Sequence, residues 1–245
     1  MKIESALYLL PVNISESPIS DTIPAGNVEI IRQIKYYIVE NIRTARRFLK
    51  KCDSNIDISE LTFYELNEHT QEINVSSYLN VLREGQPIGL MSEAGCPGVA
   101  DPGAIAVRIA HMEGLKVVPL VGPSSILMSL MASGLNGQNF TFNGYLPADK
   151  GEREKKIKEL ENISRHDNLT QIFIETPYRN VNMMESLIKT LSNDTWLCVS
   201  TAVSDPKKES IVTRRIAEWR KEGYNIDKVP TVFLFYSPAL HKKRR

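Results

Sequence analysis

The chain has 245 residues, enough for one large domain or two of moderate size, and its 42% hydrophobic and 24% charged residues are ordinary for a soluble globular protein. Its net charge of +1 excludes a positive field over the whole molecule, so any attraction to nucleic acid must come from local patches. The three scattered cysteines, Cys52, Cys96 and Cys198, argue against a disulfide framework and favour a reducing, cytoplasmic setting.

Three further absences narrow the class of protein. The first residues carry an acid and no long apolar core, so we expect no signal peptide. No apolar run approaches the about 20 residues of a membrane span, so we expect no membrane contact. The four histidines lack the spacing of metal ligands, so we expect no metal site.

Apolar runs that predict strands alternate with helical patterns along nearly the whole chain. We expect strands at residues 6–12, 36–39, 61–66, 88–91, 116–120, 170–174, 196–201 and 231–236. We expect helices at residues 28–34, 44–52, 75–84, 104–112, 125–133, 151–163, 180–191 and 214–222. This alternation is typical of parallel sheets covered by helices, so the predicted fold class is α/β.

The first charged segment at a strand end is Glu40-Asn41-Ile42-Arg43, directly after the expected strand at 36–39. Glu40 and Arg43 are three residues apart, which suits either an exposed ion pair or two groups that face a ligand. The position at a strand end favours the second interpretation, because ligands of open α/β sheets bind at the carboxyl ends of the strands.

The loop at residues 92–103 reads Ser-Glu-Ala-Gly-Cys-Pro-Gly-Val-Ala-Asp-Pro-Gly and joins an expected strand to an expected helix. Its three glycines and two prolines let the backbone approach a ligand closely and stiffen the rest, which predicts part of a small-molecule site. Glu93 can accept hydrogen bonds from ribose hydroxyls or an amino group, or it is a solvated loop residue. Asp101 is expected to cap the following helix, a role that is compatible with presenting the loop to a ligand.

The segment Val121-Gly122-Pro123-Ser124 is the expected boundary between two domains, because Gly-Pro strongly breaks regular structure. It predicts an N-terminal α/β domain over residues 1–121, a C-terminal α/β domain over 122–237 and a basic tail over 238–245. A cleft between two such domains commonly holds a cofactor. The tail is either a solvated end or an electrostatic contact to RNA.

The C-terminal half repeats the pattern of polar groups at element ends. Ser124 or Ser125 can cap the expected helix at 125–133, whose first N–H groups can also bind a ligand. Glu175-Thr176-Pro177-Tyr178-Arg179 follows another strand, and Tyr145 suits either stacking or core packing. The basic segment at 150–158 contains acids and favours a solvated helix face, whereas Lys207, Lys208, Arg214 and Arg215 add positive charge.

Several common motifs are missing from the chain. It contains no Gly-x-Gly-x-x-Gly, no Gly-x-x-x-x-Gly-Lys-Ser/Thr and no Gly-x-Ser-x-Gly. These absences argue against a nicotinamide or flavin Rossmann site, a P-loop and a nucleophile elbow. The loops instead suggest a ligand with apolar and hydrogen-bonding parts and no obligatory phosphate.

Taken together, these segments resemble the tetrapyrrole methylase family of S-adenosylmethionine-dependent methyltransferases. They are most similar to the branch that methylates the 2′-hydroxyl of a cytidine in small-subunit ribosomal RNA. The order and spacing match from about Leu7 to Tyr236. The carrying residues are Glu40-Asn41-Ile42-Arg43, His69, Ser92-Glu93-Ala94-Gly95-Cys96-Pro97, Asp101-Pro102-Gly103, Val118-Pro119-Leu120-Val121-Gly122-Pro123-Ser124, Gly144-Tyr145-Leu146-Pro147 and Glu175-Thr176-Pro177-Tyr178-Arg179.

The resemblance implies two α/β domains with the methyl donor in the cleft between them, usually in a homodimer. It also implies S-adenosylmethionine as the cofactor and ribosomal RNA or the small subunit as the partner. A ribose hydroxyl is a poor nucleophile and would gain from a base, so our candidates are Glu40 and His69, with Arg43 orienting a carboxylate or binding phosphate. Carried over by position, the donor-binding residues are Leu10, Ser92, Glu93, Ala94, Gly95, Asp101, Ser124, Ser125, Ile174, Glu175, Ala202 and Thr231.

The chain departs from the family pattern mainly on the acceptor side. The loop at residues 11–17 lacks the usual glycine, Asn41 stands where the family has a second acid, and Glu93 replaces an aspartate. A late Glu-x-Thr-Lys pattern is blurred into residues 204–209. Two alternatives therefore stay open, a methyltransferase for a tetrapyrrole or another small molecule and a non-catalytic S-adenosylmethionine-binding protein.

Overall fold

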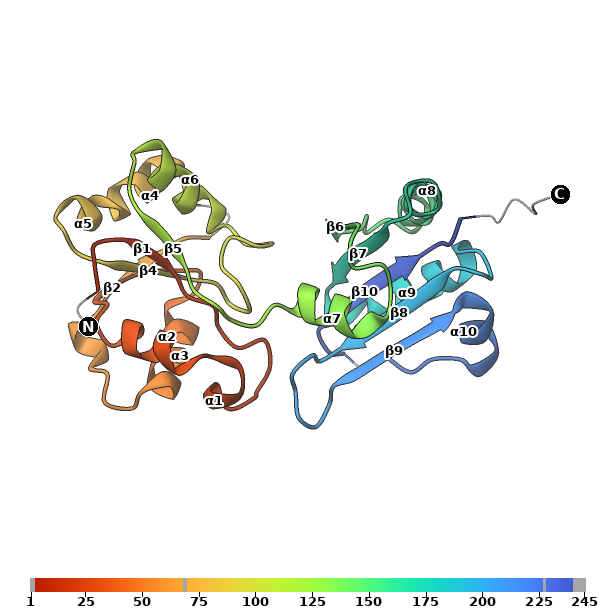
Figure 1. Ribbon diagram of the computed structural model, residues 1–245, viewed down its shortest axis with the longest axis horizontal. Coiled ribbons are helices and arrows are strands. Elements are labelled where there is room, and N and C mark those ends of the chain that lie inside the picture. The colour runs from red at the N-terminus through yellow and green to blue at the C-terminus, as the bar shows by residue number, and fades with distance from the viewer. Residues whose placement is uncertain (1–2, 68–69, 227, 240–245) are drawn as a thin grey trace. The chain divides into compact units, whose positions relative to one another are not determined.

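The computed structural model describes residues 3–67, 70–226 and 228–239, and the chain divides into two compact units (Figure 1). Unit 1 covers residues 1–124 and unit 2 covers residues 125–245, so the division lies at the end of the segment 121–124. Each unit is described by itself. Within the described ranges, no helix is long and apolar enough to cross a membrane.

Unit 1 contains a fully parallel sheet of five strands in the order β3-β2-β4-β1-β5. The strands are β1 (Leu7–Leu9), β2 (Tyr36–Val39), β3 (Thr62–Glu65), β4 (Ile88–Met91) and β5 (Val117–Pro119). The helices are α1 (Ile19–Thr22), α2 (Ala25–Ile31), α3 (Ile42–Cys52), α4 (Glu72–Tyr78), α5 (Asn80–Arg83) and α6 (Ala104–Met112), with a 3-10 turn at Ile58–Glu60. The predicted parallel arrangement is confirmed in this unit.

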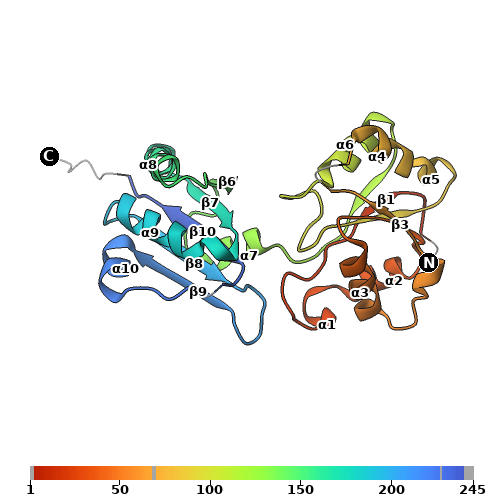
Figure 2. The ribbon, with the colours of Figure 1, turned by 180° about the vertical axis from the view of Figure 1, so that it is seen from behind.

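Helices cover both faces of the unit 1 sheet, as parallel sheets require. Successive residues of β1 point to opposite faces, so Tyr8 packs with α2 and α3 whereas Leu7 packs with α4, α5 and α6. Figures 1 and 2 show these two helical layers on either side of the strands. The arrangement leaves the carboxyl ends of β1, β2 and β4, which are neighbours in the sheet, to carry polar loops.

Unit 2 contains a mixed sheet of five strands in the order β6-β7-β10-β8-β9. The strands are β6 (Phe140–Tyr145), β7 (Thr170–Glu175), β8 (Trp196–Thr201), β9 (Ser210–Arg215) and β10 (Thr231–Tyr236). Its helices are α7 (Ser125–Ser133), α8 (Lys150–Asp167), α9 (Asn180–Thr190) and α10 (Ile216–Glu222), with a 3-10 turn at Pro177–Arg179. Figure 1 shows α7 in front of this sheet, and Figure 2 shows α9 and α10 in front of its other face.

The prediction of parallel sheets is wrong for unit 2, where only β6 and β7 pair in parallel. The expected helix at 214–222 also begins late, at Ile216, because Arg214 and Arg215 complete β9. A polar turn accounts for the direction of β9, since the Asp205 carboxylate accepts hydrogen bonds from the Lys207 and Lys208 N–H groups. The turn folds the chain back as a β8–β9 hairpin, which composition alone did not distinguish from a loop.

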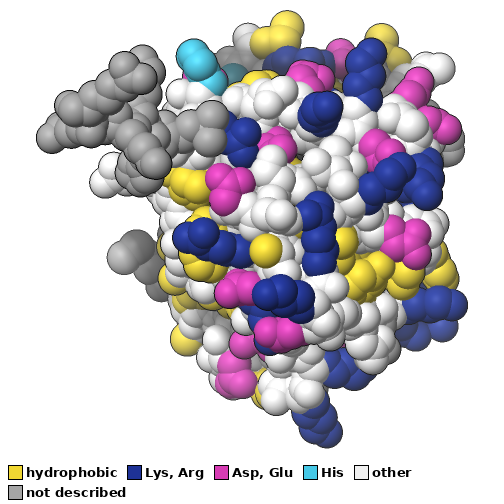
Figure 3. Space-filling model, turned by 90° about the vertical axis from the view of Figure 1, so that its right-hand side faces the viewer, with side chains coloured by type: hydrophobic (Ala, Val, Ile, Leu, Met, Phe, Trp, Pro, Cys, Tyr) yellow, Lys and Arg dark blue, Asp and Glu magenta, His cyan; other side chains and the backbone are white. Residues whose placement is uncertain are grey.

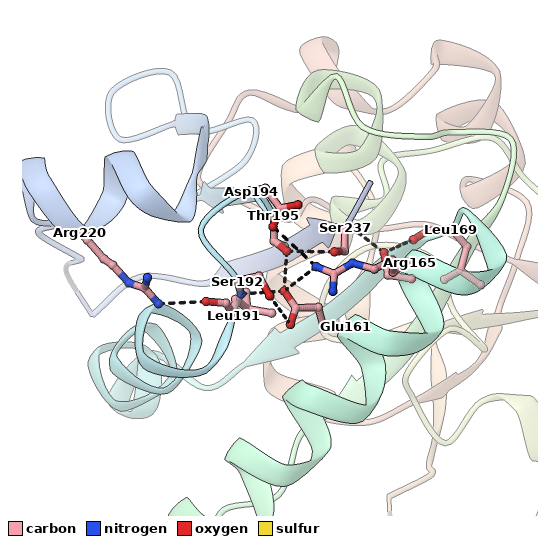
Figure 4. A network of polar contacts seen from close by, with 10 residues as sticks. Glu161, Arg165, Leu169, Leu191, Ser192, Asp194, Thr195, Arg220 and Ser237 are labelled. Atoms are coloured by element: carbon pink, nitrogen blue, oxygen red, sulfur yellow. Dashed lines mark hydrogen bonds and ion pairs between the residues drawn. The ribbon is translucent and has the colours of Figure 1, made fainter. Parts of the chain in front are cut away.

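A buried polar network connects helix α8 of unit 2 to the segment before β8 and to the end of β10 (Figure 4). The Glu161 carboxylate on α8 accepts hydrogen bonds from the Ser192 N–H at 2.8 Å and from the Ser192 and Thr195 hydroxyls. The Thr195 oxygen lies 3.1 Å from the Ser237 hydroxyl, just beyond β10, and accepts a hydrogen bond from it. Only 4% of Glu161 is exposed, so water would not readily replace its carboxylate as the acceptor for these donors if the side chain were removed.

Candidate active site

The loops after β1 and β4 are hydrogen-bonded to each other at the carboxyl ends of the unit 1 strands. Val12 and Gly95 form an antiparallel bridge, in which the Val12 N–H donates to Gly95 O at 2.9 Å and the Gly95 N–H to Val12 O at 3.2 Å. The Ser92 hydroxyl donates to the Gly95 carbonyl at 3.3 Å. Gly95 has a φ of 75°, a conformation that glycine adopts without strain. These contacts fix the backbone of the predicted ligand loop.

Asp101 closes the second half of the loop after β4. One of its carboxylate oxygens accepts hydrogen bonds from the Gly98 and Gly103 N–H groups, each at 2.7 Å. Burial raises the pKa of this carboxyl, and the two hydrogen bonds oppose the rise. The expectation that Asp101 caps the helix is wrong, because α6 begins at Ala104 and its cap residue is Gly103. The predicted cap lies two residues before the observed one, and the Asp101 carboxylate binds N–H groups of the loop that precedes the helix.

The segment 121–124 packs against the loop after β1. The Asn27 side-chain amide donates to the Val121 carbonyl at 2.8 Å, and the Cys96 thiol lies 3.4 Å from the Pro123 carbonyl oxygen. A Cβ atom on Gly122 would lie only 2.2 Å from the Cβ of Pro11, so glycine is required by this close approach. Three loops of unit 1 therefore meet around the end of β1.

Replacing Gly122 by alanine is expected to destabilise unit 1 by about 1–3 kcal/mol, because the added methyl group overlaps the rigid ring of Pro11. The measurement is chemical denaturation followed by circular dichroism. Gly26→Ala is the matched control, since a Cβ at Gly26 meets no atom within 4 Å. Equal stability of the two variants would contradict the packing of segment 121–124 described above.

Glu40 and Glu93 lie together at the ends of β2 and β4. The Glu93 N–H donates to the Glu40 carboxylate at 3.1 Å, and the Thr44 hydroxyl donates to the Glu93 carboxylate at 2.5 Å. Burial raises the pKa of Glu40, the hydrogen bond from Glu93 opposes the rise, and the nearby Asp101 and Glu93 charges add to it. A half-buried carboxyl whose pKa is raised above the usual value for glutamate is a stronger base than an exposed one.

The predicted neighbours of Glu40 have different environments. Asn41 is the cap residue of α3, because its side-chain oxygen accepts the Arg43 N–H at 2.9 Å and the Thr44 N–H at 3.3 Å. This explains physically why an amide is tolerated at Asn41. Arg43 is exposed at the first turn of α3. His69 lies outside the described residues, so its role as a base stays a prediction.

A cavity of about 360 Å³ lies beside Glu93 in unit 1. Its walls come from the loop after β1, from α3 and from the loop after β4. The lining residues are Val12, Asn13, Ser15, Glu16, Thr44, Ala45, Arg47, Phe48, Lys51, Met91, Ser92 and Glu93. The sequence predicted Ser92 and Glu93 in this group but missed the α3 residues, although their i, i+4 spacing offers a signal.

The predicted donor-binding residues of unit 1 are in part structural. The side chain of Leu10 packs in the apolar core, and its N–H donates to the Leu90 carbonyl at 2.9 Å. Glu93 and Ala94 are exposed, so they can meet a ligand. Of the predicted set in this unit, Glu93 and Ala94 thus offer side chains, and Ser92 and Gly95 offer a fixed backbone.

In unit 2, three of the predicted residues lie together at one end of the central strands β7, β10 and β8. Thr231 is opposite Glu175 on β7 and opposite Thr201 on β8, directly before Ala202. One Glu175 oxygen accepts hydrogen bonds from the Thr176 N–H at 2.7 Å and from the Arg179 guanidinium. The other Glu175 oxygen is buried and has no hydrogen-bond partner.

The side-chain oxygen of Asn180 is a second unpartnered acceptor at this end of the strands, and the sequence analysis did not single it out. Its amide nitrogen donates to the Val229 carbonyl at 2.8 Å and to the Thr231 hydroxyl at 2.9 Å. Its oxygen is buried without a partner, like that of Glu175. Ile174 packs against α7 in the apolar cluster, and Ser125 begins α7 directly after Ser124. Among the described residues, no group of three or more His, Cys, Asp or Glu side chains could hold a metal ion.

Comparisons with known proteins point to one group of methyltransferases. The chain is 30% identical over 220 residues to the ribosomal RNA small subunit methyltransferase I of Buchnera aphidicola subsp. Schizaphis graminum, covering 88% of the chain and 72% of that protein. It is 28% identical over 225 residues to the protein of the same name from Escherichia coli O157:H7, covering 91% and 74%. The protein of that name from Vibrio cholerae is 31% identical over 188 residues, covering 77% and 61%, so the chain spans about three fifths of it.

Solved structures with the same fold are tetrapyrrole methyltransferases. The structure of the methyltransferase CobJ superposes with a TM-score of 0.61 at 14% identity, covering 95% of this chain and 99% of that one. The uroporphyrin-III C-methyl transferase of Thermus thermophilus, in complex with S-adenosylhomocysteine, gives 0.55 at 16% identity, covering 94% and 97%. No protein-family profile matches the chain. The structural likeness concerns the fold and confirms the predicted pair of α/β domains.

Proposed function

Because the chain belongs to the tetrapyrrole methylase family, alongside relatives named ribosomal RNA small subunit methyltransferase I, we propose that it transfers a methyl group from S-adenosylmethionine to a ribose 2′-hydroxyl of small-subunit ribosomal RNA. The observation that carries the acceptor side is the half-buried Glu40 carboxyl, fixed by the Glu93 N–H where β2 and β4 end. A ribose hydroxyl is a weak nucleophile, and a nearby carboxylate with a raised pKa can accept its proton.

The residues present suit a donor of this chemistry. The amino groups and ribose hydroxyls of S-adenosylmethionine are hydrogen-bond donors, so they need acceptors. Unpartnered acceptor oxygens occur on Glu175 and Asn180, and Glu93 is exposed at the fixed loop after β4. Donor binding by the predicted residues of both units is part of the proposal, and these acceptors are what supports it.

In the proposed mechanism, bound S-adenosylmethionine supplies a methyl group that is already activated by its positively charged sulfur. Glu40 orients the acceptor hydroxyl and takes its proton as the new oxygen–carbon bond forms and the carbon–sulfur bond breaks. The backbone of Ser92–Gly95, fixed by the bridge to Val12, holds the loop in place. No covalent bond to the protein is required. We further propose that the chain works in the cytoplasm. We also propose that it is a homodimer, which light scattering of the purified protein can test.

Binding of S-adenosylhomocysteine is expected to stabilise the protein by mass action, by about 2.7 kcal/mol at a ligand concentration of 100 times Kd. A thermal shift assay compares this ligand with NAD as the control, because the chain lacks the Gly-x-Gly-x-x-Gly motif of nicotinamide sites. A shift with NAD alone, or with neither ligand at millimolar concentration, would remove the donor from the proposal.

The decisive experiment measures methyl transfer to purified small ribosomal subunits by mass spectrometry of the ribosomal RNA. The proposal requires one added methyl group on a ribose. Methylation of a tetrapyrrole precursor in place of RNA would instead make the chain a small-molecule methyltransferase. Donor binding without transfer to either acceptor would make it a non-catalytic binding protein.

A further inference from the structure

Helix α3 of unit 1 separates its residues into an apolar face and a basic face. Ala45, Phe48 and Leu49 are buried against the sheet at helical spacing. The opposite face carries five cations and no acid within the bounds of the helix. The cations are Arg43, Arg46, Arg47, Lys50 and Lys51. Packing against the sheet explains the apolar face. The basic face does not stabilise the helix, because like charges at i, i+4 repel each other.

Three of these cations form a stripe along the helix, which we call the α3 stripe. It consists of Arg43, Arg47 and Lys51, each four residues from the next and therefore about 6 Å apart along the helix axis. The side chains of Arg43 and Arg47 make no ion pair with any residue in the described ranges. Lys51 pairs with Glu16 at 3.1 Å, but 88% of the Glu16 side chain is exposed, so water screens this contact strongly.

The α3 stripe starts at the candidate acceptor site and borders the cavity beside it. Arg43 lies in the first turn of α3, three residues after Glu40. Thr44, on the next position, holds the Glu93 carboxylate. Arg47 and Lys51 line the 360 Å³ cavity together with Glu93. The positive charges thus extend along α3 from the end near Glu40, where the acceptor hydroxyl would lie, to the cavity.

The long helix α8 of unit 2 does not share this organisation. The cations of α8 alternate with acids, and Lys156 pairs with Glu159 at 2.8 Å. Figure 3 likewise shows Lys and Arg side chains interspersed with Asp and Glu over the face that it draws. With a net charge of only +1 for the whole chain, a run of cations without acids is a local feature that can attract a polyanion.

We propose that the α3 stripe binds the phosphate backbone of the RNA strand that carries the acceptor ribose. This inference rests on the proposed function and adds to it the surface that holds the substrate. Successive phosphates of the strand contact Arg47 and Lys51, and the ribose at the Arg43 end reaches Glu40. Guanidinium and ammonium groups bind phosphate through charge-assisted hydrogen bonds that do not depend on base sequence. Helix α3 therefore positions the strand, and the cavity beside it accepts part of one nucleotide.

The test is the double variant Arg47→Gln and Lys51→Gln, which removes two charges from the stripe and leaves Glu40 and Arg43 in place. The KM for small ribosomal subunits is expected to rise about tenfold, the effect of two exposed charge contacts. The slope of log KM against log salt concentration is expected to become shallower by about 1.4, because each phosphate contact on a single strand contributes about 0.7. The affinity for S-adenosylhomocysteine, measured by calorimetry, is expected to stay within twofold of the original protein.

The matched control is Lys155→Gln and Lys158→Gln on α8, which removes the same charge from exposed positions of a helix with mixed charges. This control should change neither KM nor the salt slope beyond experimental error. If the α3 variant behaves like the α8 control on subunits that the original protein methylates, the inference is wrong and the proposed function stands. If the original protein methylates no RNA, the proposed function itself fails, and retention of RNA on a filter by the original protein but not by the α3 variant still tests the stripe.

Discussion

Replacing Glu40 by glutamine is expected to lower kcat by about 10²–10⁴-fold, the range over which a positioned proton acceptor contributes to a reaction. The glutamine side chain keeps an oxygen that can accept the Glu93 N–H, so the loop after β4 should stay in place. What it loses is the ability to take a proton. The affinity for S-adenosylhomocysteine should therefore be unchanged, which separates a chemical role from a role in donor binding.

The pH dependence of the rate gives a second measure of the same residue. Glu40 acts as a base only when ionised, and burial raises its pKa above the usual value for glutamate. Activity should therefore fall on acidification at a higher pH than an ordinary carboxyl would give, and the fall should vanish in the residual activity of Glu40→Gln. Glu60→Gln, at an exposed position paired with Lys35, is the control. A Glu40→Gln enzyme with full kcat would show that Glu40 does not take the proton.

Replacing Glu161 by alanine is expected to lower the free energy of unfolding of unit 2 by about 2–4 kcal/mol. The change removes the buried acceptor for the Ser192 N–H and for the Ser192 and Thr195 hydroxyls (Figure 4). It also leaves Arg165 without its i, i+4 partner on α8. Three donors that water reaches poorly would then lack an acceptor.

Tryptophan fluorescence during urea denaturation reports on unit 2 alone, because both tryptophans of the chain, Trp196 and Trp219, lie in it. Glu159→Ala on the same helix is the control, since Glu159 makes only an exposed pair with Lys156 and should cost less than about 1 kcal/mol. Equal midpoints for the two variants would mean that the buried network contributes nothing to stability.

The strands with the strongest apolar runs could be predicted from the sequence. Residues 36–39, 88–91, 196–201 and 231–236 form strands with the expected bounds, because burial on both faces makes each a continuous apolar run. Helices at 104–112 and 125–133 also begin and end as expected. These elements follow from local chemistry that tertiary packing did not override.

The elements that the sequence placed wrongly depend on pairing between distant residues. Arg214 and Arg215 suit an amphipathic helix by spacing, yet they end β9, where Arg215 stacks over the Trp196 ring of the neighbouring strand at 4.9 Å. The strand at 140–145 was missed because its residues are mostly part-exposed at the edge of the sheet. An edge strand has one neighbour only, so its burial pattern gives a weak periodic signal.

The sequence by itself determined the two-domain α/β class and the glycine- and proline-rich loops at the ends of strands, because each depends on residue type and strand position. It also predicts Glu40 and Glu93 as neighbours of a ligand. Only the tertiary structure decided that Asn180 joins Thr231 and that Arg47 and Lys51 share a cavity with Glu93. The reason is physical. Hydrogen bonds and charge contacts of these groups form between segments that the folded sheet brings together, and no local pattern in the chain encodes such distances.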